Sequence, residues 1–316
     1  MRVPAVTVQG LTKSYGRVRA VDGVSFQVEA GEVFALLGPN GAGKTTTIEI
    51  LEGFRRRDTG EVRVLGIDPG DRRSGQRLRS QLGVVLQELA VEPFLSVRQV
   101  LERNAGYYPR PRSVSEVIEL IGLAEKADAK VKSLSGGQQR RLDVGLGIVG
   151  NPALLFLDEP TTGLDPAGRR TSWELVGRLA GEGTTVILTT HYMEEAETLA
   201  NQVAIIAGGK IVANGPPGSL GGRDRGAATI RFGLPAGVAV ADLPVPVAGD
   251  GPTVEMRTDR ELEVLNELTR WALDQDVALT GLTVSRNTLE DVYLQLTGAD
   301  PERLGEDMAH PTPARR

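Results

Sequence analysis

The chain has 316 residues, of which 40% are hydrophobic and 24% charged, the composition of an ordinary folded protein long enough for about two domains. Its formal net charge of −5 argues against a general nucleic-acid-binding surface, and the absence of cysteine excludes disulfides and thiolate metal sites. We expect no secretion signal and no apolar run of about 20 residues that could span a membrane, so any membrane contact requires another chain.

Residues 38–46, GPNGAGKTT, match the spacing G-x-x-x-x-G-K-[ST] of a phosphate-binding loop. The apolar run 33–37 predicts a buried strand before it, and residues 46–51 predict a helix after it. Glycines let backbone N–H groups approach phosphate oxygens, and the helix start adds further donors. We expect Lys44 to neutralise the β- and γ-phosphates and the Thr45 hydroxyl to ligate Mg²⁺. The expected nucleotide contacts here are Gly38, Pro39, Asn40, Gly41, Ala42, Gly43, Lys44, Thr45 and Thr46.

The segments around this loop predict strands and contain one aromatic residue of interest. Residues 6–8 and 24–28 alternate between apolar and polar, as strands do, and residues 13–16 read as a turn. Tyr15 is either a strand-end aromatic or, because it precedes the phosphate loop, a ring that stacks on adenine. The arginine run 55–57 favours a solvated surface over a nucleic-acid contact.

A further apolar strand over residues 82–86 ends at Gln87. In a parallel α/β sheet the carboxyl ends of the strands face the ligand crevice, so Gln87 is placed to reach a Mg²⁺ ion or the attacking water. From about residue 88 to residue 150 the pattern changes to helical stretches broken by prolines. This change predicts a helical subdomain inserted in the α/β sheet.

The helical subdomain contains the sequence LSGGQQRR at residues 134–141. Ser135 is a natural N-cap, and residues 142–149 continue as a mostly apolar helix. The chain therefore has a second helix start that could bind an anion, far in sequence from the phosphate loop.

Two acidic residues follow a buried strand. The apolar run 154–157 places Asp158 and Glu159 at its carboxyl end, where buried carboxylates are costly without a partner, so a cation is expected nearby. Asp158 suits Mg²⁺, and Glu159 could polarise a water. Residues 184–190 predict a neighbouring strand that ends at His191, which we expect to contact the γ-phosphate rather than to be structural.

The last third of the chain predicts a second domain. Residues 203–213 read as a hairpin, and the Gly- and Pro-rich segment 215–222 closes a first domain of residues 1–220. Residues 226–298 have the strand and helix patterns of a small α/β domain without a chemical motif, which favours packing or dimerisation over ligand sensing. We expect the polar tail 301–316 to be disordered.

Three motifs stand together in this order: GPNGAGKTT, LSGGQQRR, and LLFLDEP followed by TTGLDP. They resemble the motifs of the ATP-binding-cassette (ABC) ATPases, and the resemblance covers residues 6–220. It implies an α/β fold, namely a P-loop NTPase nucleotide-binding domain with a mixed sheet core and a helical subdomain. The small C-terminal α/β domain would be an addition to that domain.

The resemblance implies ATP and Mg²⁺ as cofactors and a role for each motif residue. Tyr15 would stack on adenine, Glu159 would be the catalytic base, and Gln87 would sense the metal and couple to the partner protein. The catalytic residues would be Glu159, His191, Gln87 and Lys44; the metal contacts Thr45, Gln87 and Asp158; and the further nucleotide contacts Tyr15, Ser135, Gly136, Gly137, Gln138 and Asp165.

Within this family the chain resembles the ATPases of bacterial drug exporters of the daunorubicin-resistance type, through TTGLDP, HYMEEAE (191–197) and NTLEDVYLQLTG (287–298). The resemblance implies a Mg-dependent ATPase that acts as a homodimer, in which residues 135–138 of one subunit close over ATP held by the other. It also implies a place at the cytoplasmic face of the membrane through a separate polytopic permease, and efflux of a drug, lipid or polysaccharide. An importer ATPase and a soluble ABC ATPase are the alternatives, and no nucleic-acid partner is expected.

Overall fold

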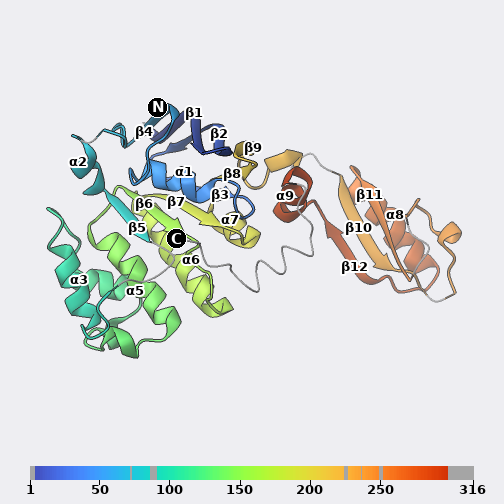
Figure 1. Ribbon diagram of the computed structural model, residues 1–316. Coiled ribbons are helices and arrows are strands. Elements are labelled where there is room, and N and C mark those ends of the chain that lie inside the picture. The colour runs from blue at the N-terminus through green and yellow to red at the C-terminus, as the bar shows by residue number, and fades with distance from the viewer. Residues whose placement is uncertain are drawn as a thin grey trace. The chain divides into compact units, whose positions relative to one another are not determined.

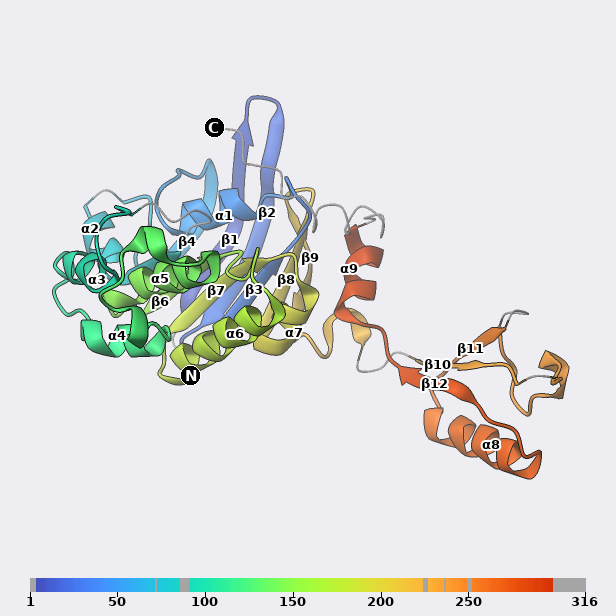
Figure 2. The same cartoon turned by 90° about the horizontal axis from the view of Figure 1, so that it is seen from below.

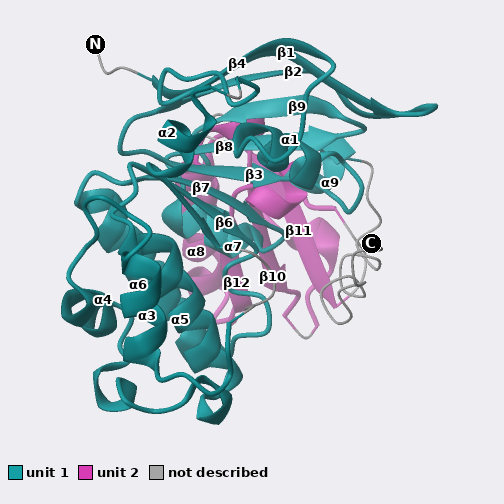
Figure 3. Ribbon diagram, turned by 60° about the vertical axis from the view of Figure 1, so that its left-hand side comes forward, with its two compact units in different colours: residues 1–217, 293–316 teal, residues 218–292 magenta. Residues whose placement is uncertain are grey.

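The computed structural model describes residues 4–71, 73–85, 91–223, 227–235, 237–248 and 252–297 (Figure 1). These residues divide into two compact units (Figure 3). Unit 1 holds the described residues up to 217 together with 293–297, and unit 2 holds those from 218 to 292.

A six-stranded sheet forms the centre of unit 1. In spatial order its strands are β5 (Leu82–Val85), β6 (Leu154–Asp158), β7 (Thr185–Thr190), β3 (Val33–Leu37), β8 (Gln202–Ala207) and β9 (Lys210–Gly215). The first five are parallel, and β9 returns antiparallel beside β8. Every residue of β3 is buried, which explains why its sequence reads as a continuous apolar run.

A three-stranded antiparallel sheet forms the second layer of unit 1. Its strands are β2 (Val18–Glu29), β1 (Pro4–Tyr15) and β4 (Thr59–Val64) in spatial order, and β1 and β2 form a long ribbon (Figure 2). Phe26 of β2 stacks on Phe34 of β3 with ring centroids 5.0 Å apart, so the two sheets share one apolar core. The prediction of a turn over residues 13–16 is wrong for residues 13–15, which belong to strand β1. Irregularities in the β1–β2 register interrupt the alternation that would have revealed the strand.

Helices cover the central sheet and form a separate helical part of unit 1. The helices that follow strands of the sheet are α1 (Lys44–Leu51), α6 (Pro166–Gly181) and α7 (Met193–Leu199), and the short α2 (Gly75–Arg79) precedes β5. The helical part contains α3 (Val97–Ala105), α4 (Val114–Leu120), the short 3₁₀ helices η1 (Ala124–Lys126) and η2 (Val131–Ser133), and α5 (Gly136–Val149). Helices α3, α4 and α5 pack on one another, and α5 also packs against β5.

Unit 2 is built on a three-stranded antiparallel sheet of β11 (Thr253–Thr258), β10 (Ala228–Gly233) and β12 (Thr280–Ser285), in that spatial order. Its core contains Ile230 and Phe232 of β10 and Leu268 of helix α8 (Glu261–Asp274), all of which are buried. Strand β12 was not expected from the sequence, and nearly all of its residues are exposed. The 3₁₀ helices η3 (Leu220–Gly222) and η4 (Val240–Asp242) also belong to unit 2, and α9 (Leu289–Thr297) ends the described chain.

None of the helices that the structure describes has an apolar stretch long enough to cross a bilayer. The central sheet instead provides the feature that positions a site. Because β6, β7 and β3 are adjacent and parallel, the residues that follow these three strands lie along one edge of the sheet. The phosphate-loop sequence, the acidic pair and His191 follow these strands.

Candidate active site

The phosphate loop connects β3 to α1, and two of its glycines have no room for a side chain. A Cβ atom on Gly38 would lie 2.3 Å from the carbonyl oxygen of Ile206. A Cβ atom on Gly43 would lie 2.3 Å from the carbonyl oxygen of Ala20, and its φ of +107° is one that other residues rarely adopt. The loop therefore needs glycine at both positions to hold its curved path.

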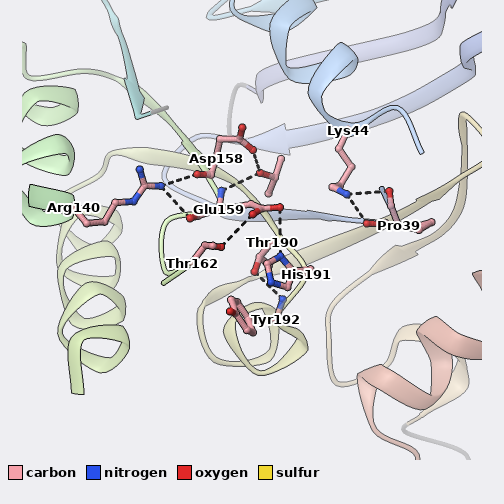
Figure 4. A network of polar contacts seen from close by, with 11 residues as sticks. Pro39, Lys44, Arg140, Asp158, Glu159, Thr162, Thr190, His191 and Tyr192 are labelled. Atoms are coloured by element: carbon pink, nitrogen blue, oxygen red, sulfur yellow. Dashed lines mark hydrogen bonds and ion pairs between the residues drawn. The ribbon is translucent and has the colours of Figure 1, made fainter. Parts of the chain in front are cut away.

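Lys44 begins helix α1 and folds back over the loop. Its Nζ donates to the carbonyl oxygens of Gly38 at 2.5 Å and Pro39 at 3.1 Å, and Figure 4 shows the ammonium group against these carbonyls. The N-cap residue Gly43 offers no side-chain cap to α1. The helix start therefore leaves its first N–H groups for another acceptor, next to the exposed residue Thr45.

The carboxyl end of β6 is tied to the neighbouring strand β7. The hydroxyl of Thr189 donates to Oδ1 of Asp158, which orients this carboxylate. The backbone N–H of Glu159 donates to the carbonyl oxygen of Thr189 at 3.0 Å. Glu159 itself has φ +47°, in the left-handed region that non-glycine residues seldom adopt.

Glu159 and His191 are brought together from the ends of β6 and β7 (Figure 4). The Nδ1 of His191 lies 3.4 Å from Oε1 of Glu159, and the hydroxyl of Thr162 donates to Oε2 at 3.2 Å. The hydrogen bond from His191 is the largest influence that lowers the pKa of Glu159, assisted by Thr162 and the charge of Lys44 and opposed by burial. The carboxylate is thereby held ionised, as a general base must be.

A shell of residues holds the His191 segment in place. The ring of Tyr192 lies 4.2 Å from the ring of His191, and its backbone N–H donates to the hydroxyl of Thr190 at 3.0 Å. Glu195, on α7, is fully buried and accepts a hydrogen bond from Nε1 of Trp173 at 3.1 Å. Burial raises the pKa of Glu195, and the nearby Thr190, Thr161 and Trp173 partly offset that rise.

The second expected helix start lines a separate groove. Ser135 is the N-cap of α5 in a capping box, because its side chain accepts from the Gln138 N–H and the Gln138 side chain accepts from the Ser135 N–H. Asp165 is the N-cap of α6 and accepts from the Gly168 N–H at 2.7 Å. The groove has a volume of about 520 Å³, and its described lining is Ser135, Gly136, Gly137, Gln138, Arg141, Gly163, Leu164, Asp165, Ala167, Gly168 and Thr171.

Tyr15 ends β1 and is 40% exposed. The guanidinium carbon of Arg55 lies 5.3 Å from the ring centroid, and Nε of Arg55 donates to Glu49 at 2.5 Å. Arg57 makes a two-pronged ion pair with Asp68 at 2.8 and 2.7 Å. Arg55 and Arg57 therefore both have specific partners within the chain.

Comparison with known proteins decides the family. A family model described as ABC transporter matches residues 21–162, and one described as ABC transporter domain-containing protein-like, C-terminal domain, matches residues 228–288. The daunorubicin resistance ATP-binding protein DrrA3 of Streptomyces coeruleorubidus is 38% identical over 94% of this chain and 96% of its own length. The chain belongs to the ABC transporter family. Membership makes it a nucleotide-binding ATPase with a P-loop NTPase fold.

Further relatives support this assignment. The Nod factor export ATP-binding protein I of Ralstonia nicotianae is 38% identical over 94% of this chain and 95% of its own length. A dimeric post-hydrolysis structure of the ATP-binding cassette MJ0796 with ADP and Pi is 25% identical, with a TM-score of 0.60 over 67% of this chain and 98% of its own. An ATP-binding subunit of an ABC transporter has a TM-score of 0.62 at 24% identity and supports the fold alone.

The ABC cassette has the donors that a nucleotide and a magnesium ion need. Phosphate oxygens need N–H donors and a cation. The backbone at Gly38 and Gly43, which has no side chain, and the ammonium group of Lys44 provide them. Among the described residues no cluster of three or more His, Cys, Asp or Glu could hold a metal. Asp158 and the Thr45 hydroxyl, the residues expected to hold Mg²⁺, offer the oxygen atoms that this ion prefers as ligands. Gln87, the third expected metal contact, lies outside the described residues.

Several residues of the site were not expected from the sequence. Arg140 hydrogen-bonds the backbone of the acidic pair, although only residues 135–138 of its motif were assigned a role. Glu52, at the end of α1, is buried, and its pKa is raised to about 8 by burial and then by Asp158 and Glu49. The available signal was an acidic residue next to the apolar positions of this helix.

Proposed function

We propose that this chain is the ATP-hydrolysing subunit of an exporter and drives efflux of a drug, lipid or polysaccharide through a separate permease. The observation that carries this proposal is the meeting of the phosphate loop, Glu159 and His191 at the carboxyl ends of three adjacent parallel strands. The printed functions of relatives, daunorubicin resistance and Nod factor export, support export as the direction.

In this proposal each residue acts at a defined atom. Glu159 accepts the proton of the attacking water through its ionised carboxylate, and His191 donates toward the γ-phosphate. Lys44 leaves the loop carbonyls for the β- and γ-phosphates, and Tyr15 stacks on adenine. Mg²⁺ held by Thr45, Asp158 and Gln87 would neutralise phosphate charge. The phosphate contacts are Gly38, Pro39, Asn40, Gly41, Ala42, Gly43, Lys44, Thr45 and Thr46.

In this proposal the start of helix α5 at Ser135 acts in a homodimer. The groove at Ser135 and Asp165 of one subunit would close over the nucleotide bound to Lys44 of the other, which explains why one chain has two anion-binding helix starts. ATP can drive this closure only because it binds the closed dimer better than the open one. A nearly complete switch takes about 5.5 kcal/mol of differential affinity. The solved dimeric cassette supports such an assembly by relationship.

We assign the nucleotide-binding domain to residues 1–220, with the helical subdomain at about 88–150, and an accessory or dimerisation domain to residues 226–298. The protein would lie at the cytoplasmic face of the membrane through its permease, without a nucleic-acid partner. The tail at 301–316 lies outside the described residues.

The experiment that tests this function is capture of partners from native membranes with a tagged Glu159→Gln variant in Mg-ATP, followed by mass spectrometry. The proposal expects a polytopic membrane protein in stoichiometric amount, and much less of it with a Lys44→Ala variant that cannot hold ATP. Recovery of ribosomes or DNA, or of the soluble dimer alone, would contradict it. ATP-dependent uptake of the cargo into the cytoplasm, measured with the captured complex in vesicles, would favour an importer.

A further inference from the structure

Arg140 makes a set of contacts that the proposed chemistry does not use (Figure 4). Its Nη2 donates to the carbonyl oxygens of Asp158 at 2.7 Å and Glu159 at 3.0 Å, and its Nε donates to that of Pro160 at 3.1 Å. The guanidinium group is planar and has five donors in fixed directions. One side chain therefore holds three consecutive carbonyl groups around the candidate base.

The backbone of Glu159 needs such restraint. Its φ of +47° brings Cβ close to the carbonyl oxygen, so this conformation persists only where the surroundings enforce it. On its amino side the N–H of Glu159 donates to Thr189 of β7 at 3.0 Å. Strand β7 thus holds one side of the residue, and Arg140 holds the other.

Arg140 is itself fixed in position. Its Nη1 donates to Oδ2 of Asp143 at 2.8 Å, and both side chains are largely buried. Both residues belong to α5, and Arg140 stands two residues beyond Gln138 in the first turns of this helix. A displacement of the start of α5 would therefore move the carbonyl groups next to the candidate base.

We propose that Arg140 is a positioning residue that holds the Glu159 carboxylate in its productive place through the backbone, and that ties this base to the helix beginning at Ser135. The inference rests on the proposed function, because it takes Glu159 as the base. Near this base Arg140 donates to backbone carbonyl groups, so we expect it to act on the rate of the chemical step and not on nucleotide affinity.

This role differs from that of His191. His191 approaches the Glu159 carboxylate directly, whereas the contacts of Arg140 near the base go to backbone carbonyl oxygens. Loss of Arg140 should therefore lower the rate of the chemical step by misplacing the carboxylate.

The first test is the steady-state ATPase activity of Arg140→Gln. We expect kcat to fall about tenfold to a hundredfold, as for a misplaced catalytic group, with KM within about twofold. The matched control is Arg178→Gln, which removes an exposed helical arginine that pairs with Glu182 and should leave kcat unchanged. A kcat of Arg140→Gln equal to that of the wild type would overturn the inference.

Arg140→Gln leaves the buried Asp143 without its cation and could fail to fold for that reason alone. The double variant Arg140→Gln/Asp143→Asn removes both charges and should fold with the same loss of kcat. If the double variant folds and recovers wild-type kcat, the inference is wrong. Arg140→Lys keeps the charge but cannot reach three carbonyls and Asp143 at once. We expect less than half of the wild-type kcat, and full activity would show that charge rather than position matters.

A double-mutant cycle separates positioning of Glu159 from an independent effect. In a Glu159→Gln background, Arg140→Gln should change the residual rate by less than about twofold, since the base through which it acts is gone. An undiminished fall in that background would contradict the inference. Absence of ATPase activity in the wild type and in Arg178→Gln would instead contradict the proposed function.

Discussion

The Nδ1 atom of His191 and the Oε1 atom of Glu159 lie 3.4 Å apart, although the two residues are 32 positions apart in the sequence. The two residues meet because β6 and β7 are parallel neighbours and each residue follows its strand directly. One consequence is electrostatic: a donor from β7 keeps a half-buried carboxylate from β6 ionised. A second consequence concerns position: His191 lies next to Glu159 and could also reach a phosphate bound at the same edge of the sheet.

Replacement of His191 by Ala should move the acid limb of the ATPase pH profile to higher pH. The hydrogen bond from His191 lowers the pKa of Glu159 and burial raises it, so loss of the histidine lets the pKa rise. We expect kcat to fall about a hundredfold at pH 8, and the acid midpoint of the variant to lie at higher pH than that of the wild type. His191→Gln retains a donor and should shift the limb less. An acid midpoint shared by wild type and alanine variant would contradict this account.

Lys44→Ala should strongly lower the affinity for ATP. The ammonium group lies against the loop, where it donates to the Gly38 and Pro39 carbonyls. Hydrogen bonds to charged groups contribute about 1.5–3 kcal/mol each. We expect affinity for a fluorescent ATP analogue to fall by at least about a hundredfold, with the fold retained by circular dichroism. Wild-type affinity in the variant would show that the nucleotide binds elsewhere.

Gly43→Ala should disrupt the phosphate loop. The new Cβ would lie 2.3 Å from the backbone of Ala20 at a φ of +107°, so either the loop or the neighbouring strand must shift. The matched control is Gly177→Ala on α6, where no atom lies within 4 Å of the new Cβ. The control should raise the unfolding free energy by about 0.5–1 kcal/mol, while Gly43→Ala lowers both the melting temperature and ATP affinity. Equal behaviour of the two variants would contradict the steric argument.

Glu195→Gln should stabilise the protein, and more so as pH rises. Burial raises the pKa of Glu195 above its ordinary value of 4.5 in the folded state, so the folded protein retains a proton that the unfolded chain releases. Wild-type stability is then lost as pH rises above about 4.5, whereas the amide has no charge to bury. Melting temperatures should coincide near pH 4.5 and differ by a few °C at pH 8. A difference that does not change with pH would contradict this assignment.

The sequence predicted the strands and loops that carry the site because local patterns determine them. The buried strands of residues 33–37 and 154–157 read as apolar runs, and each ends at the polar or glycine residues that the parallel sheet then gathers at one edge. Prediction of these elements needed no knowledge of which strands are neighbours.

Contacts across the fold could not be predicted in this way. Arg140 reaches carbonyl groups 18 to 20 positions away, and the side chain of Arg55 lies over Tyr15 from a different element. The left-handed backbone of Glu159 also has no sequence signal, since acidic residues adopt it only when neighbours such as Thr189 and Arg140 enforce it.

The most direct test of the central claim compares Mg-dependent ATP turnover of the wild type with that of Glu159→Gln, together with the oligomeric state of each in ATP. The account predicts steady turnover without accumulation of a dimer in the wild type. The variant should lose at least about a hundredfold in rate, keep its affinity for ATP, and accumulate a dimer only when ATP is present. Hydrolysis by Glu159→Gln at the wild-type rate would contradict the assignment of the base and with it the proposed mechanism.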